Sequence, residues 1–190
     1  MLLLARRLRE SGFETELFGY SALLEKHAEI VSRLVGRLKR LAAEGKEVGL
    51  VGHSFGGLLL REGIAAVPEL RVKHLVMLGT PNRQPRLAEY VYGRFPLRLL
   101  RGSCGQCLTD SAWYQSFPKP RVPYTSIAGT GGWRGRWSPF RGEPNDGVVA
   151  VSETIVNDGD QPVLVPALHT FIMNLVSVHV LIVQKFEGER

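Results

Sequence analysis

Residues 52–57 read GHSFGG and lie between an apolar run at 47–51 and a helix-forming segment at 58–67. A serine between two glycines at a strand-to-helix junction fits the G-x-S-x-G pattern, which holds the serine in a tight, strained turn. Such a turn lifts the hydroxyl above the carboxyl edge of a parallel sheet, beside the positive end of the helix dipole. The stretch therefore predicts Ser54 as a nucleophile. A glycine-rich turn with an incidental serine is the alternative.

The residues around Ser54 have separate predicted roles. We expect glycine at positions 52 and 56 to relieve the crowding around the serine, because glycine has no side chain. The backbone N–H of Phe55 is predicted to donate to a substrate oxygen that becomes negatively charged. The predicted turn consists of Gly52, His53, Ser54, Phe55, Gly56 and Gly57.

A serine hydroxyl needs a base at neutral pH, most simply a histidine oriented by a carboxylate. Of the five histidines, His169 alone follows a short predicted strand and precedes a helix. That position places it above the same sheet edge as Ser54, and it is the predicted base; a surface or capping role is the alternative. The other histidines lie in helices, in the turn or in a strand: His27, His53, His74 and His179.

Asp146 is the predicted acid that orients His169. It lies in PNDG (144–147), after a predicted strand and upstream of His169, in the order Ser, Asp, His. Asp-Gly is also an ordinary turn sequence, so a structural role is the alternative. Asp158 and Asp160 are rival candidates, but their loop leads into a strand, which places them at the opposite sheet edge.

Apolar spacing gives the order of the elements. Strands alternating with helices predict a parallel sheet with helices on both faces. We expect helices at 2–9, 22–43, 58–67 and 171–186, and strands at 14–20, 47–51, 72–78, 124–129 and 162–165.

Three other features have two interpretations each. Residues 82–123, with an amphipathic piece at 86–100, form either a sheet-covering helix with its exit loop or a small lid. Cys104 and Cys107 are predicted to be reduced loop cysteines, since no further cysteine completes a zinc site. The aromatic residues before Asp146 either line an apolar acyl pocket or pin a long loop: Trp133, Trp137 and Phe140.

The composition is that of one folded domain, 1–190, with 44% apolar and 22% charged residues. The net charge of +6 comes from dispersed basic residues, which argues against nucleic-acid binding. No apolar run reaches the roughly 18 to 20 residues of a membrane span. The first residues lack the pattern of a signal peptide, so the chain as given is predicted to be cytoplasmic.

Four segments together resemble the lipase and esterase branch of the α/β-hydrolase superfamily: GHSFGG (52–57), LGTPN (78–82), PNDGVVAVSE (144–153) and LHTFIM (168–173). The resemblance implies an α/β-hydrolase-like three-layer sandwich with a mostly parallel sheet and a minimal cap. It also implies hydrolysis of a small-molecule or lipid ester through an acyl-enzyme, with Ser54, Asp146 and His169 as the triad. Neither a metal nor an organic cofactor is implied.

One departure from the family concerns the start of the chain. Members usually open with a buried strand and a glycine-rich loop that supplies a second oxyanion N–H, and its loss costs on the order of 100-fold to 1,000-fold in rate. Here the chain starts at the segment that resembles the first helix. We expect the reading frame to begin upstream of Met1, which leaves secretion or membrane association open. The alternative is a weakened remnant that binds without turnover, or an acyltransferase.

Overall fold

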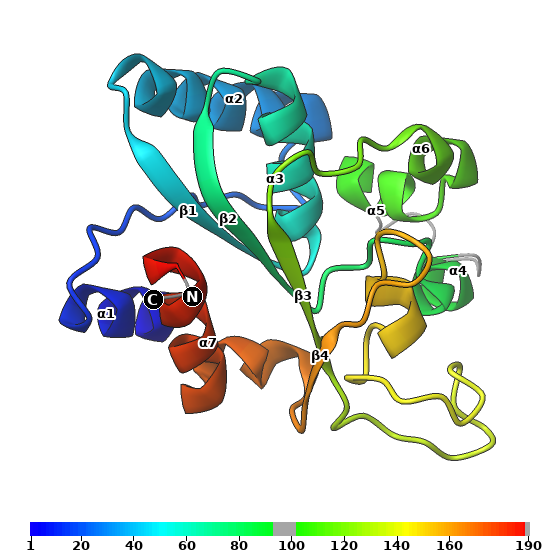
Figure 1. The fold of residues 1–190 in the computed structure, drawn as a ribbon. Coiled ribbons are helices and arrows are strands. Elements are labelled where there is room, and N and C mark those ends of the chain that lie inside the picture. Colours follow the sequence, from blue (N-terminus) through cyan, green and yellow to red (C-terminus); the bar gives the residue numbers. More distant parts are fainter. Residues whose placement is uncertain (93–101, 189–190) are drawn as a thin grey trace.

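The computed structural model describes residues 1–92 and 102–188. Its centre is a sheet of four parallel strands in the order β1-β2-β3-β4, as the alternation of strands and helices predicts (Figure 1). The strands are β1 (Glu47–His53), β2 (Arg71–Leu78), β3 (Tyr124–Gly129) and β4 (Val163–Val165).

Helices cover both faces of this sheet. α1 (Leu2–Glu10) and α7 (Val176–Glu187) lie on one face, and α2 (His27–Ala43) and α3 (Phe55–Ala66) lie on the other (Figure 1). The predicted three-layer α/β sandwich is confirmed.

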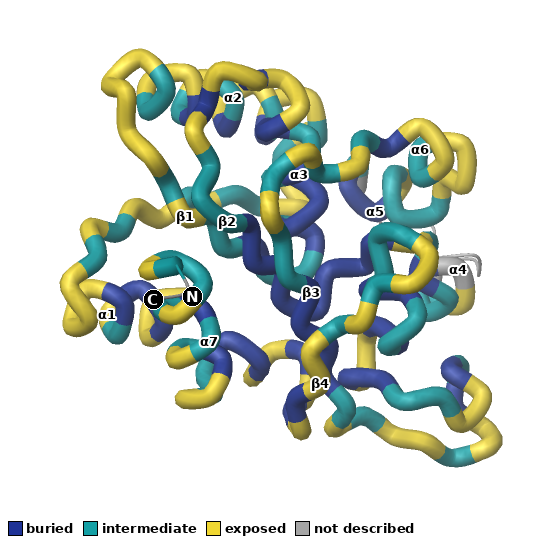
Figure 2. The backbone as a smooth tube through the Cα atoms, viewed as in Figure 1, coloured by how far each residue is buried: buried dark blue, intermediate teal, exposed yellow. Residues whose placement is uncertain are grey.

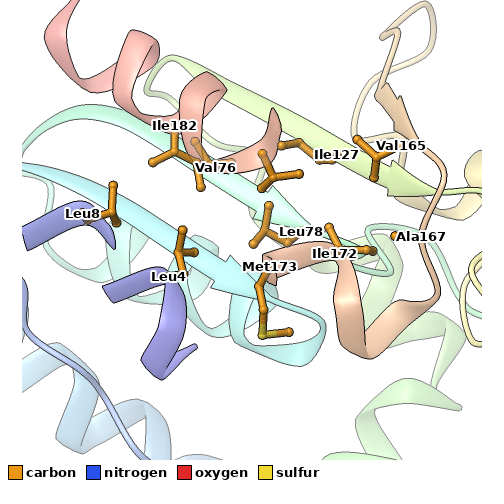
Figure 3. Close-up of a cluster of buried hydrophobic side chains, with 11 residues drawn as sticks. Leu4, Leu8, Val76, Leu78, Ile127, Val165, Ala167, Ile172, Met173 and Ile182 are labelled. Carbon is orange, nitrogen blue, oxygen red and sulfur yellow. The ribbon is translucent and has the colours of Figure 1, made fainter. Parts of the chain in front are cut away.

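Each face has its own hydrophobic core. Figure 3 shows the cluster under α1 and α7, where leucines of α1 meet side chains from β2, β3 and β4. The second cluster joins α2 and α3 to the other face. Figure 2 shows that burial is deepest along the C-terminal halves of β2 and β3, whereas β1 is half-buried or exposed over much of its length. β2 is the only sheet neighbour of β1 in the described part of the chain.

The predicted strand at 14–20 is wrong. This segment is extended but belongs to no strand. Two of its carbonyls accept hydrogen bonds from α2 instead, since the Arg33 guanidinium donates to Gly19 O at 2.9 Å and the Arg37 guanidinium donates to Leu17 O at 3.0 Å. Alternating polarity is insufficient for a strand, because the backbone also needs a neighbouring strand to pair with.

Two predicted helices have different bounds. α2 begins at His27 rather than at 22, because Ser21 closes a separate turn, with Leu24 N–H donating to Ser21 Oγ at 3.3 Å. The predicted helix at 171–186 is two pieces, η3 (His169–Asn174) and α7, separated by the extended backbone of Leu175. The Asn174 carbonyl that would continue the first piece accepts a hydrogen bond from Arg7 at 2.7 Å.

The segment 82–123 carries three short helices that lie to one side of α3 (Figure 1). They are α4 (Arg86–Tyr92), α5 (Gly102–Leu108) and α6 (Ser111–Ser116), and η2 (Val151–Thr154) follows Asp146 further along the chain. Most of the predicted amphipathic piece at 86–100 lies outside the described residues. Cys104 and Cys107 are free thiols, but they lie on α5 and not in a loop. Within the described ranges, no helix has both the length and the apolar character that a membrane crossing requires.

Candidate active site

Ser54 occupies the sharp turn between β1 and α3. Its φ of 55° and ψ of −128° are unusual for a residue with a side chain. Backbone hydrogen bonds hold the turn, with Ser54 N–H donating to Leu78 O at 2.8 Å and Gly57 N–H donating to Ser54 O at 3.0 Å. The strand, turn and helix therefore meet at Ser54 as the sequence predicts.

The close approach of the helix to the sheet requires glycine at two positions. A Cβ on Gly52 would lie 2.5 Å from Gly57 Cα, and a Cβ on Gly57 would lie 2.1 Å from Thr80 Oγ1. At Gly56 a Cβ would meet only Tyr20 Oη, at 3.5 Å, which is an ordinary contact. The expectation that Gly56 relieves the crowding is therefore wrong, and Gly57 has that role.

The Phe55 N–H lies at the start of a helix. Phe55 is the first residue of the 12-residue helix α3, and its N–H makes no hydrogen bond to any residue in the described part of the chain. The N-terminal N–H groups of a helix point outward and carry the positive end of its dipole. This N–H therefore has the character that an oxyanion donor needs.

Asp146 and His169 form a buried pair. Asp146 lies in the loop after β3, and His169 is the first residue of η3, after β4. Asp146 Oδ2 is 2.7 Å from His169 Nδ1, and the two residues are 1% and 7% exposed. Their backbones are also joined, since His169 N–H donates to Asp146 O at 2.9 Å. The structure thus brings together the predicted base and the predicted acid.

The backbone fixes the orientation of this carboxylate. Asp146 Oδ1 accepts hydrogen bonds from Val148 N–H at 2.9 Å and from Val149 N–H at 2.7 Å. The other oxygen, Oδ2, accepts from His169. A carboxylate only accepts, so Nδ1 of neutral His169 carries the proton and Nε2 has a free lone pair. This is the tautomer that a general base needs.

Gly79 lies directly against the pair and has no predicted role in the sequence-based assignment. It follows β2 with a φ of +55°, and a Cβ there would lie 2.9 Å from Asp146 Oδ2 and 3.1 Å from His169 Nδ1. The signal in the sequence is a glycine directly after a buried strand, next to the strand that leads to Ser54. Its spatial role follows only from the connections of the sheet.

Ser54 lies at the same edge as the pair but is not hydrogen-bonded to it. The ring of His53 is 4.7 Å from the His169 ring, and His53 Nε2 is 3.0 Å from the His169 carbonyl oxygen. Ser54 Oγ has no hydrogen bond to His169 or to any other residue in 1–92 and 102–188. Hydrogen bonds between a nucleophile and its base often tighten only when substrate binds.

The rival candidates have other surroundings. Each contacts a residue outside the Asp146–His169 pair, and none is hydrogen-bonded to Ser54. The contacts are His27 with Glu62, His74 with Thr125, His179 with Ser11, Asp158 with Arg83, and Asp160 with Tyr124.

His53 is neutral at pH 7. Burial, together with the neighbouring His169 ring, lowers the pKa of His53 to about 4. Because a carbonyl only accepts, the hydrogen bond to His169 O places the proton of neutral His53 on Nε2. His53 therefore supports the backbone of His169 and places no positive charge beside the imidazole.

This lowered pKa predicts a pH-dependent stability. Between pH 6.5 and about 4 the unfolded chain binds a proton at His53 that the folded chain does not bind, so stability falls as the pH falls through this window. Between about pH 7.5 and pH 5 we expect wild type to lose about 2 kcal/mol more unfolding free energy than the His53→Gln variant. Urea unfolding of both proteins at the two pH values measures this. Equal losses would contradict the buried, neutral His53.

Metal ligands do not gather in the part of the chain that is described. No three His, Cys, Asp or Glu side chains within it form a group able to hold a metal ion.

Comparisons with known proteins give the fold a name. No protein-family model matches the sequence, and no curated protein matches it. Solved structures do match. Lipase BlEst2 from Bacillus licheniformis, in its mature form, is 20% identical with a TM-score of 0.58, over 75% of this chain and 67% of that one. Phospholipase PlaB from Legionella pneumophila, in complex with thio-NAD, is 16% identical with a TM-score of 0.71, over 97% of this chain and 54% of that one. The chain has an α/β-hydrolase fold.

A second structure of PlaB agrees with this result. It is 16% identical with a TM-score of 0.57, over 82% of this chain and 41% of that one. The chain therefore spans about half the length of PlaB or less.

In this α/β-hydrolase fold the loop from β3 to Asp146 projects from the carboxyl edge of the sheet (lower right in Figure 1). Phe140 is buried at 3% exposure and anchors the loop, whereas Trp133 and Trp137 are 62% and 80% exposed. Leu168 and Phe171, on either side of His169, are 46% and 55% exposed. Large apolar side chains are therefore exposed on the loop before Asp146 and on both sides of His169 in the chain.

Proposed function

We propose that this protein is a serine hydrolase that cleaves carboxylic esters through an acyl-enzyme on Ser54. The observation that carries the proposal is the buried Asp146–His169 pair, 2.7 Å apart, at the same sheet edge as a serine in a strained turn before a helix. The names of the two matched proteins, a lipase and a phospholipase, support an ester as the substrate.

The proposed mechanism has two half-reactions, and in each of them His169 acts first as a base and then as an acid. Ser54 Oγ attacks the ester carbonyl carbon while His169 Nε2 takes the hydroxyl proton. Phe55 N–H stabilises the oxyanion. The intermediate then expels the alcohol, which receives the proton from His169. In the second half-reaction His169 takes a proton from water, and the water oxygen attacks the acyl-enzyme carbonyl. Ser54 Oγ then leaves with the proton from His169, and the carboxylic acid is released. Asp146 holds the imidazole and stabilises its positive charge.

The exposed apolar side chains favour an ester with an apolar acyl chain. Trp133 and Trp137 are exposed on the loop before Asp146, Leu168 and Phe171 are exposed near His169, and Arg136 lies over the Trp137 ring at 5.3 Å. Aromatic side chains flanked by arginine are typical of surfaces that meet a lipid–water interface. We therefore propose a lipid ester as substrate.

A fluorophosphonate probe tests the enzyme proposal. It phosphonylates a serine only when that serine is activated, so we expect one label on the intact protein, mapped to Ser54 by peptide mass spectrometry, and no label on Ser54→Ala. If the intact protein takes no label and p-nitrophenyl esters are not cleaved, the chain is not a serine esterase. Acyl transfer to an added alcohol in preference to water would identify an acyltransferase.

The substrate proposal predicts a selective effect of Trp137. We expect Trp137→Ser to lower the rate on a long-chain ester in vesicles about tenfold, because an interfacial anchor is lost. The rate on p-nitrophenyl acetate in solution is expected to stay the same. Leu24→Ser is the matched control, because Leu24 is 84% exposed but lies in the turn before α2. Equal losses on both substrates would argue against a lipid-facing role of Trp137.

A further inference from the structure

A cavity of about 240 Å³ lies outside the candidate active site, between α3, α6 and the loop after β2. None of the residues assigned to the active site lines it. Three of its nine lining residues are cationic, namely Arg61, Arg83 and Lys119, and none is acidic. The charged residues that line the cavity are therefore all positive.

Arg61 forms the floor of this cavity and is 4% exposed. Its guanidinium donates to Pro118 O at 3.1 and 2.7 Å and to Asn82 Oδ1 at 2.8 Å, and it lies 4.7 Å from the Phe117 ring centre. These acceptors are all neutral, and Arg61 has no salt bridge to a carboxylate in the described ranges. Two of its five N–H groups therefore have no hydrogen-bond partner there.

The Arg61 charge persists at neutral pH. Burial lowers the pKa of Arg61 to about 10, so the guanidinium is still protonated at pH 7. A buried cation without a counter-ion is unfavourable, and an anion bound beside it would offset the lost hydration.

Tyr114 provides a second, independent feature of the cavity. Its hydroxyl is buried and has no hydrogen-bond partner in residues 1–92 and 102–188. Burial raises the pKa of Tyr114, so the hydroxyl stays protonated and is a donor. An unpaired buried hydroxyl is unfavourable, because it has lost its hydrogen bonds to water. The Glu153 carboxylate makes no hydrogen bond to this hydroxyl, and accepts instead from Arg86 at 2.9 Å and from Ala150 N–H at 2.8 Å.

Two exposed cations stand at the rim. Lys119 is exposed, and the one ion pair of Arg83 among the described residues is with Asp158, whose side chain is 99% exposed. An ion pair so open to solvent is weak, so Arg83 still contributes positive potential at the entrance.

We propose that this cavity binds a phosphate-bearing anion. Arg61 and Tyr114 donate hydrogen bonds at the floor, and Lys119 and Arg83 attract the anion at the rim. A guanidinium with free N–H groups, a hydroxyl donor and two further cations suit a doubly charged, multi-oxygen group better than a single carboxylate. The site shares no residue with the proposed ester hydrolysis and does not depend on it.

Isothermal titration of the full chain with inorganic phosphate and with glycerol 3-phosphate tests the proposal. We expect saturable binding that weakens about tenfold in Tyr114→Phe, since a hydrogen bond to a charged group is lost. Lys119→Gln is expected to weaken binding about threefold, and less so at high salt. Tyr114→Phe removes only the unpaired hydroxyl, so its unfolding temperature is expected to equal or exceed that of wild type. Lys39→Gln, an exposed lysine on α2, is the matched control and is expected to have no effect.

A lipid headgroup is the other source of the same chemistry, and vesicles distinguish it. The Ser54→Ala variant is mixed with vesicles that contain phosphatidic acid. If the protein binds these vesicles but neither soluble phosphate, and if Tyr114→Phe weakens the binding, then the ligand is a lipid phosphate. Absence of binding to all three probes at about 10 mM phosphate overturns the proposal. Binding that Tyr114→Phe leaves unchanged, or that Lys39→Gln weakens as much as Lys119→Gln, also overturns it.

Discussion

The Asp146→Asn variant is expected to cleave p-nitrophenyl esters with a kcat about 10⁴-fold below that of wild type, while it stays folded. The reason is the fixed orientation of the side chain. In wild type, Oδ1 accepts from Val148 N–H and Val149 N–H, and Oδ2 accepts from His169 Nδ1–H. An asparagine keeps its oxygen on the two backbone donors, so its NH₂ group faces His169.

Two donors cannot share one hydrogen bond, so His169 must move its proton from Nδ1 to Nε2. In the variant the free lone pair then faces the introduced amide group, and no base faces Ser54. Steady-state kinetics measures the loss, and Asp158→Asn is the matched control, because Asp158 is exposed at the protein surface. If Asp158→Asn lost activity and Asp146→Asn stayed within about tenfold of wild type, the assignment of the acid would be wrong.

The sequence alone predicts those elements whose pattern is local. The apolar run before GHSFGG and the helix after it predict β1, the turn and α3, and the strand at 124–129 has its predicted bounds. The order of residues along the chain predicts Asp146 and His169, because residues that follow parallel strands meet at one sheet edge. Their contact at 2.7 Å is consistent with that reasoning.

The sequence alone does not predict local structure that depends on contacts with residues far away in the chain. The segment 14–20 alternates like a strand, but its carbonyls bind arginines of α2. At the break before α7, the Asn174 carbonyl accepts a hydrogen bond from Arg7, which is 167 residues away in the chain. The sequence pattern predicts no role for Gly79, since its contact with Asp146 and His169 comes from the order of the strands. For the same reason, the sequence does not distinguish Gly56 from Gly57.

Gly57→Ala is expected to lower the unfolding free energy by about 3 kcal/mol and kcat/KM by about 100-fold. A Cβ at this position would lie 2.1, 2.8 and 2.9 Å from three atoms of the Thr80 side chain. Rotation of Thr80 cannot remove all three contacts, so α3 must move away from β2, and Ser54 moves with it. Gly56→Ala is the matched control in the same helical turn. Its Cβ meets only Tyr20 Oη at 3.5 Å, so we expect no loss and a gain of up to about 1 kcal/mol from helix propensity.

A double-mutant cycle with Thr80→Ala identifies the cause of the loss. The Thr80 hydroxyl is buried and unpaired among the described residues, so removing it alone is expected to cost little. In the Gly57→Ala background the same change removes the two atoms closest to the new Cβ, and we expect it to restore more than half of the lost stability and activity. Urea unfolding and kcat/KM on a soluble ester measure both quantities. If Gly56→Ala were as damaging as Gly57→Ala, or if Thr80→Ala gave no recovery, then contact with the sheet is not the reason for glycine at position 57. A requirement for glycine throughout the turn, independent of Thr80, would then explain the GHSFGG stretch.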